Sequence, residues 1–280
     1  MNTPFAKLLS RPLAMSEWGA REVRSVLDTP RSKLWGLTEN EETGEIDIAH
    51  DRLGNPVPKP YDLQDGTRVI PVFGVMTRGY GMIGQYYGMC DTDKIRAQII
   101  EATNDPDVTT ICLHVRSPGG DAQMCEETAR AFQAAALTKN TMTFCDEIMA
   151  SAAYYVGCAA ETVYASPSAM IGNVGSYIVL CDDSEFWEKH GVKWIVLRSG
   201  DFKGAGLDGY SEEQLAEIQK WSDSFGSQFR EFVKESRPSI DDADLQGQIF
   251  LKNELTISHF CDFIASDLQE ALNHNSKLVI

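Results

Sequence analysis

The chain has 280 residues and carries 41 acidic against 25 basic side chains, which gives a net charge of −16 at pH 7. That charge argues against a nucleic-acid partner, because binding a phosphate backbone requires a basic face and the sequence contains no run of Lys and Arg. The length allows one large α/β domain or two small ones, with a sizeable buried core.

Cysteine usage and hydropathy indicate a reduced, cytoplasmic setting. The seven cysteines are odd in number, form no Cys-x-x-Cys pair and lie mostly in apolar segments, where free cysteine packs as a small hydrophobe. We therefore expect no disulfide framework, no metal site and no cofactor. The sequence has no run of about 18 apolar residues and no secretory signal, so no membrane partner is expected.

The first 60 residues are predicted to form an N-terminal arm, followed by one folded domain at residues 61–280. Residues 16–27 could form an amphipathic helix, and residues 29–60 are mostly irregular with several turn residues. We expect this arm to dock on its own domain or on a neighbouring subunit.

Strands and helices are predicted to alternate along the domain. The first strand is expected at residues 68–75, where Pro71 requires an edge position or a bulge. Residues 79–84 match G-x-G-x-x-G, but no helix is expected to open there, so residues 79–88 are interpreted as a flexible loop rather than a nucleotide site. Helices are predicted at residues 92–104 (capped by Thr92 or Asp93), 121–137, 182–190, 241–245 and 258–272, with a long one after the capping box Ser211-Glu-Glu-Gln214. Further strands are predicted at residues 108–115, 142–144, 162–165, 170–178, 192–197 and 277–280.

This alternation indicates an α/β fold with a mostly parallel sheet and helices on its faces. Two strand-to-helix junctions in it could carry chemistry. Ser117-Pro-Gly-Gly120 is a turn without bulky side chains, whose backbone N–H groups near a helix start could stabilise an oxyanion. Ser151 follows a strand and lies among Ala150, Ala152 and Ala153, where small neighbours would let a substrate approach. Each junction also has a plain structural interpretation, as a simple turn and as an N-cap serine.

A serine nucleophile needs a base to take its proton. None of the five histidines has a spacing that suggests a triad, and His114 lies inside a strand. Lysine can serve as the base when burial lowers its pKa. Lys203 lies just past a predicted strand, beside Phe202 and small residues, although taken alone a loop lysine is usually a surface lysine.

Four motifs in order resemble the signal peptide peptidase A family of serine–lysine peptidases. They are Ser117-Pro-Gly-Gly120, Met149-Ala-Ser-Ala-Ala-Tyr-Tyr155, Ile171-Gly-Asn-Val-Gly175 and Ser199-Gly-Asp-Phe-Lys203. The resemblance spans roughly residues 68–256 and is greatest to the phage and prophage branch, which includes capsid assembly (prohead) proteases. It implies a crotonase/Clp-like β-β-α superhelix, assembled as a ring or dome of subunits whose active sites can draw residues from neighbours.

The same resemblance implies a role for each site residue. Ser151 would be the nucleophile and Lys203 the general base, which make residues 61–280 a serine–lysine peptidase domain. The N–H groups of Gly120, or Gly119, and Ala152 would form the oxyanion hole. Asn173 stands where the family often has a serine, and is expected to help orient the lysine.

Three functions follow as alternatives. The first is an endopeptidase that processes scaffold, capsid or portal proteins during phage head assembly, in the host cytoplasm or the assembling head. The second is a cytosolic peptide hydrolase of the same family. The third is a catalytically silent crotonase-like assembly component. A homo-oligomer is expected, while the subunit number, the cleavage preference and the question whether the arm or residues 79–88 gate the site stay open.

Overall fold

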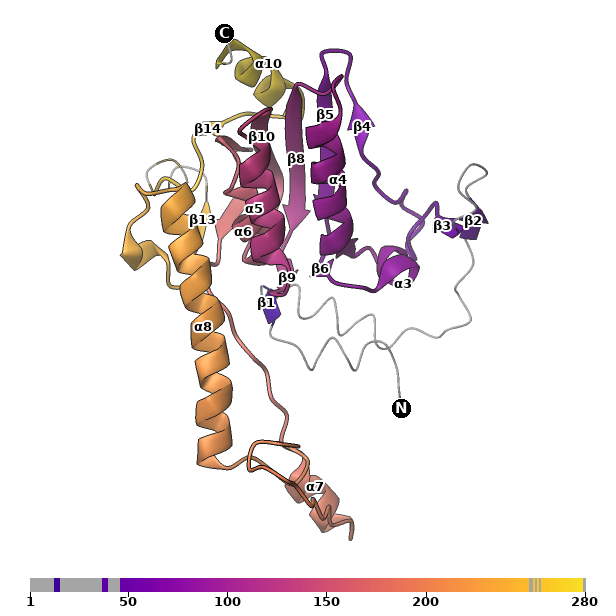
Figure 1. Ribbon diagram of the computed structural model, residues 1–280, viewed down its shortest axis with the longest axis vertical. Coiled ribbons are helices and arrows are strands. Elements are labelled where there is room, and N and C mark those ends of the chain that lie inside the picture. The colour runs from indigo at the N-terminus through magenta and orange to yellow at the C-terminus, as the bar shows by residue number, and fades with distance from the viewer. Residues whose placement is uncertain are drawn as a thin grey trace.

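A mostly parallel sheet forms the centre of the molecule (Figure 1). The computed structural model describes residues 13–15, 37–39, 46–251, 254, 256 and 258–278. The main sheet has the order β13-β12-β10-β8-β5-β4, and β11 and β14 extend it beside β10. Its strands are β4 (Tyr61–Asp62), β5 (Thr67–Phe73), β8 (Thr110–Ser117), β10 (Asn140–Ala150), β11 (Thr162–Ala165), β12 (Met170–Gly172), β13 (Ile249–Leu251) and β14 (Phe263–Ile264).

Helices cover both faces of this sheet because its strands are apolar on both sides. Val69 and Cys112 belong to one buried cluster, and their chain neighbours Ile70 and Leu113 belong to another, as the alternation of side chains along a strand requires. The larger cluster includes residues of α4 (Thr92–Asn104), α5 (Cys125–Ala135) and α6 (Ala152–Gly157). The smaller cluster includes residues of α10 (Leu268–Leu278).

A second, small sheet lies at the end of the main one. Its order is β1-β9-β6-β7, formed by β1 (Leu13–Met15), β9 (Gly119–Asp121), β6 (Met76–Thr77) and β7 (Cys90–Asp91). β9 therefore has a parallel neighbour, β6, on one side and an antiparallel neighbour, β1, on the other. The turn Ser117-Pro-Gly-Gly120 leads directly into this sheet.

One long segment projects away from the body (Figure 1). We call residues 176–221 the projecting segment; it holds α7 (Ser184–Lys189) and the first turns of α8 (Glu212–Ser236). Only the second half of α8 buries large apolar side chains in the body, among them Phe229 and Phe232. Along the projecting segment large apolar side chains are exposed, such as Ile195 at 80% and Leu197 at 94%.

Most predicted elements are confirmed, and several boundaries are corrected. The predicted α/β architecture with a mostly parallel sheet is confirmed. Pro71 lies beyond the end of the β4–β5 pairing, so it occupies an edge position as expected. The capping box of α8 is present, whereas α4 is capped by Asp91, one residue before the predicted cap.

Other predictions were wrong at particular residues. A short helix, α3 (Gly81–Tyr86), forms where a loop was expected. The helix predicted from Asp121 begins only at Cys125, because residues 119–121 pair as β9. Residues 192–197 form no strand, and the strand expected at 170–178 ends at Gly172.

The C-terminal predictions also change. Residues 258–272 contain β14 and the start of α10 instead of one helix, and Leu278 is helical where a strand was predicted. Residues 241–245 contain a 3-10 turn, η2 (Asp242–Asp244). The helix predicted at residues 16–27 lies outside the described residues. In the arm, β2 (Leu37–Glu39) pairs with β3 (Ile46–Ile48), and the division at residue 60 stays a prediction.

Candidate active site

Ser151 stands at the junction between β10 and α6 in a strained backbone conformation. Its φ is 53° and its ψ is −124°, in a region that residues other than glycine rarely adopt and that costs about 1–3 kcal/mol. It occupies the N-cap position of α6, but its side chain makes no capping hydrogen bond. The interpretation of Ser151 as an ordinary N-cap serine is therefore not supported, because an ordinary N-cap serine has an extended backbone and caps through its oxygen.

The surrounding chain holds this conformation in place. The N–H of Ser151 donates to the carbonyl of Gly172 at 2.8 Å, and Ala150 is paired with Gly172 in the β10–β12 register. The carbonyl of Ser151 accepts from the N–H of Tyr155 at 2.9 Å, which closes the first turn of α6. Strain persists only where neighbours over-determine it, and it concentrates at functional sites.

The expected oxyanion donors lie on neighbouring elements, since β9 packs against α6. The N–H of Gly119 donates to Ser117 Oγ at 3.2 Å and is already engaged. Gly120 must be glycine, because a Cβ there would lie 1.9 Å from the carbonyl oxygen of Met76. Ala152 is the first residue of α6, and the first N–H groups of a helix have no partner within the helix. Gly120 and Ala152 remain the candidate donors, and the backbone of Gly120 pairs with Ala14 of β1 on one side and Met76 of β6 on the other.

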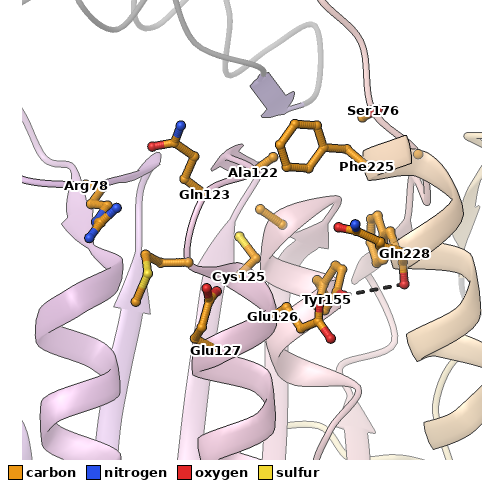
Figure 2. A pocket seen from close by; sticks show the side chains of 14 residues that line it. Arg78, Ala122, Gln123, Cys125, Glu126, Glu127, Tyr155, Ser176, Phe225 and Gln228 are labelled. Atoms are coloured by element: carbon orange, nitrogen blue, oxygen red, sulfur yellow. Dashed lines mark hydrogen bonds between the residues drawn. The ribbon is translucent and has the colours of Figure 1, made fainter. Parts of the chain in front are cut away.

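A cavity of about 320 Å³ opens beside these residues (Figure 2). Ala152 lines it on one side and Ala122, next along the chain from β9, on another. Tyr155, Phe225 and Phe229 form an aromatic wall, and the hydroxyl of Tyr155 donates to the carbonyl of Gln228 at 3.4 Å. The cavity also has polar and charged lining residues, among them Gln123, Glu126 and Glu127, so it offers a mixed surface beside the candidate backbone donors.

Lys203 does not approach Ser151 within one chain. It is exposed, in a loop where the carbonyl of Asp201 accepts a hydrogen bond from Gln214 Nε2 at 2.6 Å, at the start of α8. Ser151 lies one turn before Tyr155, which stacks on Phe229 far along α8. The 15 residues from Gln214 to Phe229 span about 22 Å at 1.5 Å per residue. The single chain therefore lacks the buried lysine that the sequence argument required.

Asn173 lies directly after Gly172, whose carbonyl holds Ser151. Its φ is 56°, its N–H donates to the carbonyl of Gln248 at 2.6 Å, and its side-chain Nδ2 donates to the carbonyl of Gly247 at 2.9 Å. The side-chain nitrogen is thus committed within the chain. Only the side-chain oxygen of Asn173 is left to accept a hydrogen bond from a lysine.

Cys125, Glu126 and Glu127 also line the cavity, and burial raises the pKa of Cys125, whereas the histidine and the two thiols described next lie outside it. His114 Nε2 is 3.0 Å from Asp146 Oδ2, and Arg116 bonds the same carboxylate, so this histidine has a structural partner. Burial raises the pKa of Cys112 and of Cys158 to about 12, so these thiols are not nucleophiles at neutral pH. Within the described residues there is no group of three metal-ligating side chains, and no helix among them is both long and apolar enough to cross a membrane.

Sequence reasoning missed the residues that shape the site without reacting. Gly172, Met76, Tyr155 and Phe229 fix Ser151, Gly120 and the cavity wall, yet they come from four separate elements. Nothing in the sequence indicated that Phe229 lines a cavity.

The family model and several of the curated relatives are peptidases. A model described as peptidase family S49 matches residues 134–273, which are 140 of the 280 residues and include Ser151 and Lys203. Capsid assembly protease C of Escherichia phage lambda is 25% identical over 167 residues, 60% of this chain and 38% of the relative. The head-tail preconnector protein of Enterobacteria phage P21 is 26% identical over 168 residues, 60% of this chain and 33% of the relative.

A cellular relative and two solved structures complete the comparison. Protease 4 of Salmonella typhi is 33% identical over 128 residues, 45% of this chain and 18% of the relative. The chain thus spans less than half the length of these curated relatives. Similar structures include a crotonase-type enoyl-CoA hydratase/isomerase from Legionella pneumophila (TM-score 0.46, 13% identity, 78% of this chain and 74% of that one). ClpP1 from Listeria monocytogenes has a TM-score of 0.43 at 11% identity, covering 72% of this chain and 93% of that one.

Proposed function

The chain belongs to peptidase family S49, and on that premise we propose that it is a serine endopeptidase whose nucleophile is Ser151 and whose general base is Lys203 of a neighbouring copy. The observation that carries the nucleophile is the strained, non-capping conformation of Ser151 beside a cavity and two candidate N–H donors. Ser151 is 1% exposed and its hydroxyl does not cap its own helix, which leaves the hydroxyl available to a ligand that enters beside Ala152.

The chemistry is acyl transfer through an ester. Ser151 Oγ attacks the scissile carbonyl carbon while its proton passes to the neutral Nζ of Lys203. The N–H groups of Gly120 and Ala152 stabilise the negative oxygen of the tetrahedral intermediate. The C–N bond then breaks, the lysine returns the proton to the leaving amine, and water releases the acyl group by the same steps.

A second copy is the proposed source of the lysine. Within one chain, Gln214 beside the Lys203 loop and Phe229 beside Tyr155 lie about 22 Å apart along α8, which argues that one copy does not assemble the pair. The projecting segment around Lys203 exposes Trp194 at 53%, Ile195 at 80% and Phe202 at 54%. Exposed apolar surface of this extent marks a protein interface. Docking it on a neighbour would bury Lys203, which favours the neutral form that a base needs.

The proposed substrates are based on the functions given in the names of two phage relatives. Two of them are a phage capsid assembly protease and a phage head-tail preconnector protein. We therefore assign scaffold, capsid or portal proteins of an assembling phage head as substrates, acted on in the host cytoplasm. Asn173 would accept a hydrogen bond from the lysine through its side-chain oxygen.

Mixing two inactive variants tests this arrangement. Ser151→Ala and Lys203→Ala should each lose activity on a casein or scaffold substrate by about 10³-fold or more. If the two residues come from different copies, an equimolar co-refolded mixture should regain roughly a quarter of the wild-type rate, because each site needs one intact residue from each of two neighbours. Lys193→Ala, another exposed lysine of the projecting segment, is the matched control and should stay active.

The outcomes separate the alternatives. A mixture as inactive as its components would contradict the shared site. Wild-type rates in both single variants would contradict the mechanism and favour a silent assembly component. Cleavage of generic peptides without cleavage of scaffold, capsid or portal proteins would favour a peptide hydrolase.

A further inference from the structure

β9 offers one backbone edge to the active site, and a segment of the same chain occupies that edge. β9 carries the candidate oxyanion residue Gly120, packs against α6, and runs into Ala122 at the cavity. Its other side is filled by the parallel pairing of Gly120 with Met76 of β6. The remaining edge is paired with β1 (Leu13–Met15), which Figure 1 shows directly beside β9.

The direction of this pairing is antiparallel, residue by residue. Leu13 pairs with Asp121, Ala14 with Gly120 and Met15 with Gly119. An extended peptide bound by adding a strand to β9 would use the same backbone groups, since a strand edge has one row of N–H and C=O groups. Leu13 pairs with Asp121, the residue before the cavity-lining Ala122, so this end of β1 lies next to the cavity along β9. A peptide substrate and β1 cannot occupy this edge together.

We propose that Leu13–Met15 is an intramolecular competitor that occupies the peptide-binding edge of β9 and must leave before a substrate peptide binds. This inference rests on the proposed peptidase function, because only a peptide substrate would need that edge. The occupant is a named segment of this chain, and the backbone pairing places it without reference to its side chains. The arm is then a regulatory element as well as a docking element.

The competitor is expected to be weak enough to displace. The pairing joins only three residues of β1 to β9, and pairings between such short strands are marginal in water. If the edge is free about one tenth of the time, the apparent affinity for a substrate peptide falls about tenfold. Removing the competitor should therefore lower KM by about tenfold and leave kcat unchanged.

Hydrogen–deuterium exchange tests the pairing without catalysis. In full-length Ser151→Ala protein, which cannot cut itself, a second change of Ala14→Pro removes a backbone N–H and disfavours the strand. The fragment covering residues 117–124 should then exchange about tenfold faster. Thr38→Pro makes the same change in β2, a strand of equal length that pairs with β3, and should leave that fragment unchanged. Equal exchange in all three proteins would overturn the proposal.

Kinetics on the active chain gives the second readout. Ala14→Pro should lower KM for a short fluorogenic peptide while Thr38→Pro does not, and a synthetic peptide of residues 9–18 should inhibit the Ala14→Pro protein competitively. Equal KM values for the two variants would overturn the competitor while leaving the peptidase intact. A fluorophosphonate probe distinguishes the other failure: if Ser151 is not labelled in any variant, the proposed function itself is wrong.

Discussion

Tyr155 stacks on Phe229 with ring centroids 4.6 Å apart and an interplanar angle of 27°. Tyr155 also stacks on Phe232 at 4.9 Å, so α6, the helix that follows Ser151, is fixed to the second half of α8. The same α8 begins beside the loop of Lys203, where Gln214 bonds the carbonyl of Asp201. One helix thus contacts both the element that follows Ser151 and the loop that holds Lys203.

Removing the aromatic contact should destabilise the body of the protein. Phe229 is 2% exposed, and Phe229→Ala would lose the stacking on Tyr155 and enlarge the cavity, which costs about 3–5 kcal/mol for a buried Phe. Urea unfolding measures the change. Trp221→Ala on the same helix, with 53% exposure, is the control and should change the free energy of unfolding by less than about 0.5 kcal/mol. If Trp221→Ala lost as much free energy of unfolding as Phe229→Ala, the first half of α8 would also be packed against the body, contrary to this structure.

The close approach of β9 to β6 makes Gly120 irreplaceable. In Gly120→Ala the new Cβ would lie 1.9 Å from the Met76 carbonyl, so the strands must separate. We expect a loss of about 1–3 kcal/mol, typical of overpacking, which is seen as a lowered Tm together with loss of activity. Gly200→Ala, where nothing lies within 4 Å, is the control for stability. An unchanged Tm in Gly120→Ala would contradict this geometry.

Asp146 should make the free energy of unfolding depend on pH in the acidic range. Burial raises the pKa of Asp146, but hydrogen bonds and charge from His114 and Arg116 outweigh it and bring the pKa down from 3.8 to about 2. A lowered folded-state pKa contributes stability that is complete above the unfolded value and is lost as pH falls from about 4 toward 2. The urea midpoint of the wild type should fall in this window, and that of Asp146→Asn should fall less. Asp107→Asn, an exposed carboxylate, should follow the wild type.

A lysine base gives the reaction a distinctive pH profile. A general base accepts a proton only in its neutral form, so kcat/KM should rise with pH. The profile should be measured at constant ionic strength and protein concentration, because the proposed site requires assembled copies. An inflection near ~6.5, typical of histidine, would contradict the assignment.

The sequence was sufficient for features set by local periodicity. The β-branched run of β8, the apolar spacing of α4 and the capping box of α8 each predicted an element within a few residues. The junction at Ser151 was also predicted, because a strand pattern and a helix pattern meet there. These signals are local, since a residue's position within a helix or strand determines which face it shares with its neighbours.

Tertiary structure alone decided the remaining features, because they depend on partners far apart in the chain. Residues 119–121 form a strand because β6 and β1 flank them, and residues 192–197 form none because no strand in the described part of the chain pairs with them. The strain at Ser151 follows from its bond to Gly172. The sequence determined that Ser151 and Lys203 are both present. Only the fold showed that α8 separates these two residues. The number of residues between them in the sequence does not determine their distance in space, which depends on how the helix is packed.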